Sequence, residues 1–204
     1  MFFRLSVFKK LIKSAYKRTG FYIGLDDESL AYYIRTPRFT IWFNKDSMPN
    51  SAKAAVIEFA GELPGPGKEF LCSELDECNQ YSFLGAGYDL CTLEDVAQAK
   101  FSISKLHNMT AGSRYMYSVC EGVVLNSILI PESVLGMIDP GAIDAKDGET
   151  SPVGPVAITF KDNQVFWYND RSALLVKDVL DGATDEYKNF AMELARLENG
   201  IEKF

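Results

Sequence analysis

The strongest constraint on the fold is a pattern of short apolar runs that occurs twice in the chain. Each occurrence holds three runs of four to six residues, separated by turns rich in Asp, Asn and Pro. Such runs, with their aromatic and β-branched side chains, are typical of β-strands. They span residues 21–25, 31–35 and 38–43 in the first occurrence and 156–160, 165–168 and 173–176 in the second. The sequence therefore predicts two three-stranded antiparallel meanders.

Helical periodicity precedes, separates and follows these meanders. Near the start of the chain, Phe8, Leu11, Ile12 and Ala15 share one helical face, and Gly20 supplies a stop signal. We expect further helices at residues 52–63 after a start signal at Ser47, from 92 to about 107, from 131 to 138, and from 184 to 201. Additional strands are expected at residues 68–73, 114–125 and 126–130.

This order of elements predicts an α+β fold with two similar halves. Each half would hold a helix, antiparallel meandering strands and a short proline-led helix, and an extra helix would end the chain. The expected units are residues 1–85, with the basic leading helix, and residues 86–204, with the acidic terminal helix. Each has a common domain size.

Charge is distributed unevenly along the chain. The first twenty residues carry six Lys and Arg and no acid, although the 204-residue chain has a formal net charge of -7. The remainder therefore holds 15 bases against 28 acids, a formal charge of -13. No apolar stretch reaches the roughly 18 residues that span a bilayer, and lysines interrupt the apolar core that a signal peptide would need. We expect a cytoplasmic protein without a membrane span.

Residues that could support catalysis are sparse. His107 is the single histidine, and the four cysteines Cys72, Cys78, Cys91 and Cys120 form no C-x-x-C pair. The acidic runs at 26–28 and 76–77 lack the further acids or lysine of a nuclease site. We predict no catalytic residue, no metal site and no cofactor. An uncharacterised hydrolase stays open as a second alternative.

The leading helix carries Lys9, Lys10, Lys13 and Lys17 on the face opposite its apolar stripe. Three interpretations are open: lysines that only solvate a packed helix, lysines that bind nucleic-acid phosphates, or a helix that lies on an anionic membrane surface. The acidic remainder would be repelled by the same membrane. The nucleic-acid interpretation assigns Lys9, Lys10, Lys13 and Lys17 as the binding residues.

Residues 127–138, with the sequence SILIPESVLGMI, run from a predicted strand into a proline-led helix, and three meandering strands follow. This order resembles a half-domain of DNA polymerase sliding clamps, over roughly residues 114–180. Clamps are acidic proteins with basic helices facing DNA, so the resemblance implies sequence-independent backbone contact through the four lysines. The acidic terminal helix departs from that pattern, as does the predicted third helix, where Lys100 and Lys105 oppose Glu94 and Asp95.

The sequence thus predicts a non-enzymatic, clamp-like accessory protein that associates with DNA through its basic helix. The alternative is an acidic protein of a phage or other mobile element that binds and inhibits a nucleic-acid-handling host protein, because an acidic surface can imitate nucleic acid. The expected partner is accordingly duplex DNA or a nucleic-acid-handling protein. Assembly into a homo-oligomer is left open.

Overall fold

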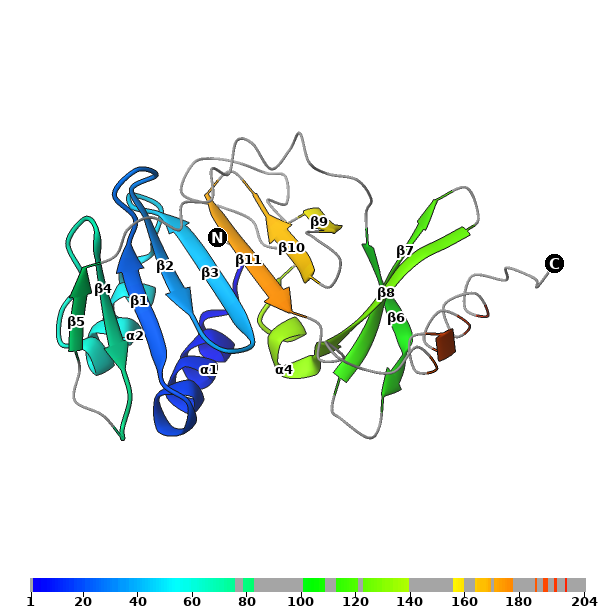
Figure 1. Cartoon of the computed structure of the whole chain (residues 1–204), viewed down its shortest axis with the longest axis horizontal. Helices are drawn as coiled ribbons and strands as arrows, with labels where there is room; N and C mark the ends of the chain where they lie inside the picture. Colours follow the sequence, from blue (N-terminus) through cyan, green and yellow to red (C-terminus); the bar gives the residue numbers. More distant parts are fainter. Residues whose placement is uncertain are drawn as a thin grey trace.

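The computed structural model describes residues 2–75, 79–82, 101–108, 113–120, 123–139, 156–159, 164–169 and 171–177, together with the single residues 186, 189, 190, 193 and 197. Side chains are described for residues 2–75, 129–139, 165–169 and 171–176 and for the five single residues, and only the backbone elsewhere. Within these limits the chain forms a mixed structure of helices and antiparallel sheets, as Figure 1 shows. The predicted α+β class is confirmed.

An eight-stranded sheet forms the largest layer of the molecule (Figure 1). Its spatial order is β5-β4-β1-β2-β3-β11-β10-β9, and every pair is antiparallel. The strands are β1 (Phe21–Leu25), β2 (Ala31–Arg35), β3 (Phe39–Asn44), β4 (Lys68–Cys72), β5 (Asn79–Ser82), β9 (Val156–Thr159), β10 (Gln164–Tyr168) and β11 (Ser172–Lys177). Both predicted meanders are present, as β1-β2-β3 and β9-β10-β11.

The two meanders join edge to edge where β3 pairs with β11. Ile41 lies opposite Leu174 in this register, and Phe39 lies opposite Val176. Strands from both predicted units, residues 1–85 and 86–204, therefore share one sheet. The division of the chain into those two units stays a prediction.

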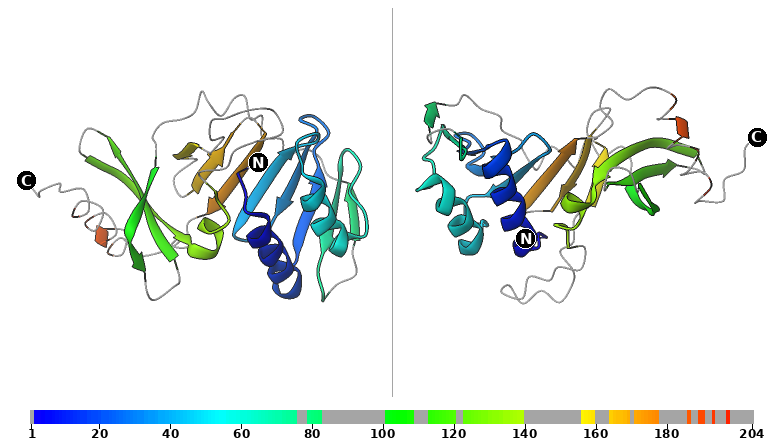
Figure 2. Two further views of the ribbon diagram at one scale, coloured as in Figure 1. Left: turned by 180° about the vertical axis from the view of Figure 1, so that it is seen from behind. Right: turned by 90° about the horizontal axis from the view of Figure 1, so that it is seen from below.

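Two helices, α1 (Leu5–Arg18) and α2 (Asn50–Ala60), lie on the same face of the sheet, as the two views of Figure 2 show. Strand residues alternate between faces, so every second side chain points toward these helices. Phe21, Ile23 and Ile41 from the strands and Phe8 and Ile12 from α1 belong to one buried apolar cluster. This core fixes α1 against the sheet.

The opposite face of the sheet carries a second, smaller apolar cluster. Tyr33, Trp42, Phe166, Ala173 and Leu175 are all buried and come from four neighbouring strands. The sheet is therefore covered on both faces along β2, β3, β11 and β10. This explains why these strands contain nearly continuous apolar runs rather than a strict alternation of apolar and polar residues.

A separate three-stranded sheet contains β6 (Phe101–Asn108), β7 (Ser113–Cys120) and β8 (Val123–Pro131) in that order. The short helix α4 (Glu132–Leu135) follows β8 directly, so the predicted proline-led helix is present. The start of the chain pairs with the segment after it: Arg4 N donates to Met137 O over 2.7 Å, and Asp139 N donates to Phe2 O over 2.8 Å.

Three predicted boundaries are wrong. The helix expected to run from 92 to about 107 is contradicted at residues 101–108, which form β6; residues 92–100 lie outside the described part. Phe101 and Ile103 alternate with serines, and this period of two, together with pairing to β7, favours a strand. β8 begins at Val123, whereas the second of the two predicted strands begins at 126. Pro49, not Ser47, immediately precedes α2.

The terminal helix is described at five residues only, which are helical: Glu186, Asn189, Phe190, Glu193 and Leu197. The periodicity places Phe190 and Leu197 on an apolar stripe, yet these side chains are 56% and 74% exposed.

Candidate nucleic-acid interface

The outward side of α1 presents two adjacent ridges of polar side chains. Residues four apart lie one above another on a helix, so Lys9, Lys13 and Lys17 form one ridge. Lys10 is followed on the next ridge by Ser14 and Arg18. All six side chains are exposed, and the four lysines assigned from the sequence therefore lie together on one surface.

The opposite side of α1 anchors the helix. Phe8 and Ile12 are 1% and 0% exposed, and the Phe8 ring meets Phe43 of β3 edge-on, with ring centroids 6.4 Å apart. Tyr16 packs on Phe59 of α2 with centroids 4.7 Å apart. These contacts fix the orientation of α1 about its own axis, so the lysines face away from the sheet.

The ends of α1 are fixed by main-chain contacts. At its start, Arg4 is bonded to Met137. At its end, Ala15 O accepts hydrogen bonds from Thr19 N over 2.9 Å and from Gly20 N over 2.8 Å, and Gly20 takes a φ of 70° there. Glycine adopts this left-handed conformation without strain. The lysine ridges are therefore carried by a helix that is joined to another segment at its start and capped at its end.

The four lysines make no ion pair with any residue that the structure describes. The two ion pairs found there join Arg4 to Asp139, at 3.8 Å, and Arg35 to Glu69, at 2.9 Å. The first turn of α1 contains no acid, and its last turn contains Lys17 and Arg18, which suits the negative end of the helix dipole. The positive charge of the four lysines is therefore not neutralised by any residue in the described part of the chain.

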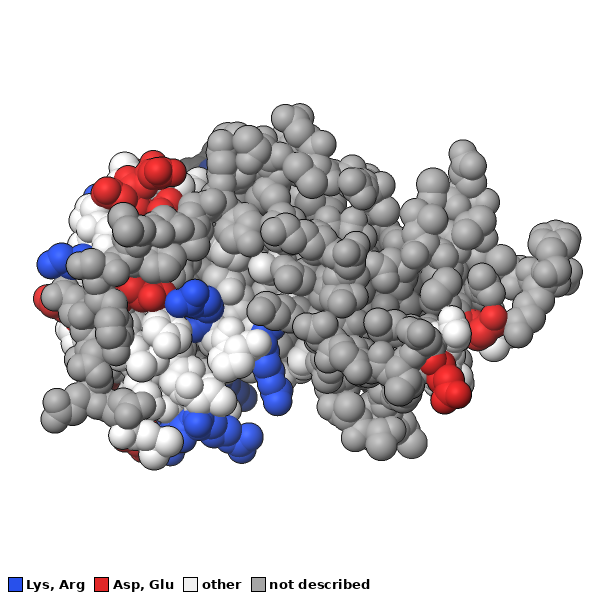
Figure 3. All heavy atoms as spheres, in the orientation of Figure 1, with Lys and Arg blue, Asp and Glu red and all other residues white. Residues whose placement is uncertain are grey.

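Two concentrations of like charge are visible on the described surface. In Figure 3, basic side chains gather along the edge where α1 ends, and acidic ones gather over the turn between β1 and β2. That turn holds Asp27 and Glu28, both exposed. These two concentrations of charge lie in separate regions, although basic and acidic side chains are adjacent elsewhere on the same face.

The acidic run at 26–28 does not form a set of converging carboxylates. Asp26 is buried, and its Oδ2 accepts a hydrogen bond from Ser29 N over 2.8 Å, which closes the β1–β2 turn, whereas Asp27 and Glu28 are exposed. The run at 76–77 lies outside the described residues, and the side chain of His107 is not described. Among the residues described, no three His, Cys, Asp or Glu side chains are grouped to hold a metal ion. The side chain of Cys72 is buried.

A buried polar cluster on the second face of the sheet could not be found from sequence patterns. Gly24 of β1 pairs with Tyr33 of β2 on one side and with Glu69 of β4 on the other. Arg35 Nη2 donates to Glu69 Oε1 over 2.9 Å, and its guanidinium lies 4.7 Å from the centre of the Tyr22 ring. The register of three strands, rather than any sequence motif, brings these residues together.

Burial governs the protonation of this cluster. Desolvation raises the pKa of Glu69 above its ordinary value, although the positive charge of Arg35 acts in the opposite direction. Desolvation, followed by the charge of Glu69, raises the pKa of Tyr33 well above its ordinary range. The cluster lies on the opposite side of the sheet from α1, so it is not part of the lysine surface.

No family model and no curated protein matches the sequence. One solved structure that is similar to the chain is the beta chain of DNA polymerase III from Streptococcus pneumoniae. The two share 9% sequence identity with a TM-score of 0.32, over 90% of this chain and 66% of that chain. The chain therefore spans just under two thirds of the length of that protein. Within the described residues, no helix is long and apolar enough to cross a membrane.

Proposed function

We propose that the protein is a non-enzymatic accessory factor that associates with duplex DNA through the lysine ridges of α1, without reading the base sequence. The observation that carries the proposal is the placement of Lys9, Lys10, Lys13 and Lys17. All four are exposed, they share one side of an anchored helix, and none is paired with a carboxylate in the described part of the chain. Positive charge in this state is available to an external anion.

The dimensions of the ridge suit a phosphate backbone. Lys9 and Lys17 are eight residues apart, which corresponds to a rise of about 12 Å along the helix. One DNA strand carries a phosphate about every 3.4 Å along the duplex axis, so several phosphates fall within reach. Four engaged lysines would give a salt slope of about -3 to -4 in a plot of log affinity against log salt concentration.

The residue type supports contact without sequence selectivity. Lysine presents a compact, hydrated point charge that suits contact with phosphates, and α1 contains none of the Asn or Gln amides that read adenine. The formal net charge of -7 opposes binding to a polyanion. Because charges separated by more than a Debye length of about 8 Å are screened in physiological salt, the local lysines dominate over the distant acids.

A gel-shift assay at low salt tests the proposal. We expect the parent protein to retard a duplex of arbitrary sequence, and we expect K9E/K10E/K13E/K17E to abolish the shift. The two-site variant K13E/K17E should weaken binding severely. The matched control K45E/K68E changes the net charge equally at two exposed lysines away from α1 and should bind as the parent does. A parent protein that retards no duplex, or a quadruple variant that binds normally, would overturn the proposal.

A further inference from the structure

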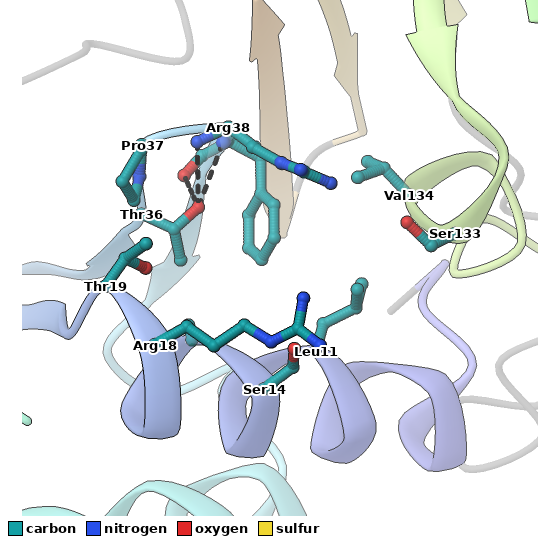
Figure 4. Close-up of a pocket in the computed structure, with 11 residues that line it drawn as sticks. Leu11, Ser14, Arg18, Thr19, Thr36, Pro37, Arg38, Ser133 and Val134 are labelled. Atoms are coloured by element: carbon teal, nitrogen blue, oxygen red, sulfur yellow. Dashed lines mark hydrogen bonds between the residues drawn. The ribbon is translucent and has the colours of Figure 1, made fainter. Parts of the chain in front are cut away.

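A pocket of about 120 Å³ lies beside the basic surface of α1. Three separate elements form its walls: α1, the turn between β2 and β3, and α4. Figure 4 shows Arg18 extending from α1 and Arg38 extending from the turn, with Ser133 of α4 at the far side. The volume exceeds several-fold what one water molecule needs.

The lining combines an apolar floor with a cationic rim. Leu11, Phe39 and Val134 provide apolar surface, while Arg18 and Arg38 carry the charge, and no carboxylate is among the described residues that line the pocket. Both arginines are exposed. Arg4 and Arg35 are each paired with a carboxylate, but neither Arg18 nor Arg38 has such a partner among the described residues. Two like charges that share a cavity, with no counterion among the described residues, favour the binding of an anion.

The elements that carry these arginines are held in place. Thr36 Oγ1 accepts hydrogen bonds from Arg38 N over 3.2 Å and from Phe39 N over 3.1 Å, which fixes the turn. Arg18 lies in the last turn of α1, where the negative end of the helix dipole would oppose an anion. Hydrogen bonds from Thr19 and Gly20 to Ala15 O satisfy one of the carbonyl oxygens at that end. The full positive charge of Arg18 outweighs the fractional negative charge that remains there.

We infer that this pocket binds one phosphate group together with its attached sugar. A guanidinium presents a rigid fork of donors that matches phosphate oxygens, and the apolar floor can accept the carbon skeleton of a sugar. The inference rests on the proposed function, because duplex DNA is taken as the source of that phosphate. Arg18 and Ser14 lie on the ridge that begins at Lys10, so a DNA strand following the ridge would reach the pocket mouth.

The test compares pyrophosphate and duplex DNA as probes on the full chain. The variant R18Q/R38Q removes both charges at exposed positions, and K45Q/K68Q is the control with the same change in net charge. By titration calorimetry we expect pyrophosphate to bind the parent and the control and to bind R18Q/R38Q at least tenfold more weakly. For duplex DNA we expect the salt slope of R18Q/R38Q to fall in magnitude by about 1, the value for one lost phosphate contact.

The outcomes separate this inference from the proposed function. Pyrophosphate binding that requires the arginines, in a protein that binds no duplex, would support the phosphate site, assign it to a free phosphate compound and overturn the proposed function. Lysine-dependent duplex binding with an unchanged slope in R18Q/R38Q, and no arginine-dependent pyrophosphate binding, would overturn the phosphate site and leave the proposed function intact.

Discussion

Gly24 lies in the middle of three paired strands, and its missing side chain determines how its neighbours pack. A Cβ built on this residue would lie 2.1 Å from both Cζ and Oη of Tyr33. The phenol ring therefore crosses over the glycine on its way toward Glu69, which pairs with Gly24 from the other side. The φ of Gly24 is not positive, so the backbone conformation does not require a glycine here. The close approach of the Tyr33 side chain does.

We predict that Gly24→Ala destabilises the fold. Tyr33 is only 3% exposed and belongs to the second apolar cluster with Trp42, so its ring has little room to move. Overpacking of this kind costs about 1–3 kcal/mol in the free energy of unfolding, measurable by urea denaturation. Gly65→Ala is the matched control, because its new Cβ meets nothing within 4 Å, and its change should stay within about 0.5 kcal/mol. Equal stabilities for the two variants would contradict this account of the β1 packing.

Glu69 predicts a pH dependence with a definite sign. Burial raises the pKa of the Glu69 carboxyl in the folded state. The folded protein therefore keeps the carboxyl proton at pH values where the unfolded chain has lost it. The stabilisation is therefore fully present below the ordinary value of 4.5 and is lost as pH rises through the raised pKa. We expect the unfolding free energy of the parent, relative to Glu69→Gln, to fall across that window in denaturation curves recorded at several pH values.

The exposed residue Glu62 supplies the matched control for the loss of one carboxylate. Glu62→Gln should not reproduce the fall seen against Glu69→Gln. A parent that instead gains stability relative to Glu69→Gln as pH rises would show that the Arg35 ion pair, at 2.9 Å, outweighs the cost of burial.

At the scale of elements, the sequence predicted the helices and strands whose apolar residues recur with the period of the structure that they form. The helix α1 has one apolar and one charged face, and the sheet buries the apolar one, so its C-terminal end and its exposed lysines could be predicted. The meander strands were equally clear, because each is short, apolar and bounded by turn residues. The strand β6 was missed because residues 101–108 lie directly after a stretch with helical spacing, and pairing with β7 decides their conformation.

The features of the candidate site also differ in whether the sequence alone could predict them. The four lysines could be assigned from the sequence, because a helical period alone places them on one surface. The pocket could not, since Arg18, Arg38 and Ser133 come from three elements far apart in the chain. The cluster around Glu69 likewise depends on the pairing of β1 with both β2 and β4. Tertiary packing, which no local pattern encodes, creates both features.

At the scale of the whole molecule, the architecture joins an anionic protein to a locally cationic helix. The pairing of β3 with β11 merges two meanders into a continuous eight-stranded sheet, and α1 packs across the face of that sheet. The sheet provides a rigid base, and the helix displays charge that the described residues do not neutralise. This combination favours contact with a polyanion at one defined surface despite a formal net charge of -7.

The most direct measurement is the salt dependence of duplex binding by the full chain, recorded by fluorescence anisotropy for the parent and for K9Q/K10Q/K13Q/K17Q. The account predicts that the parent's log affinity falls with log salt concentration with a slope of about -3 to -4 from these lysines, and that the variant loses that slope. A parent that binds no duplex at any salt concentration, or a variant whose slope equals that of the parent, would contradict it.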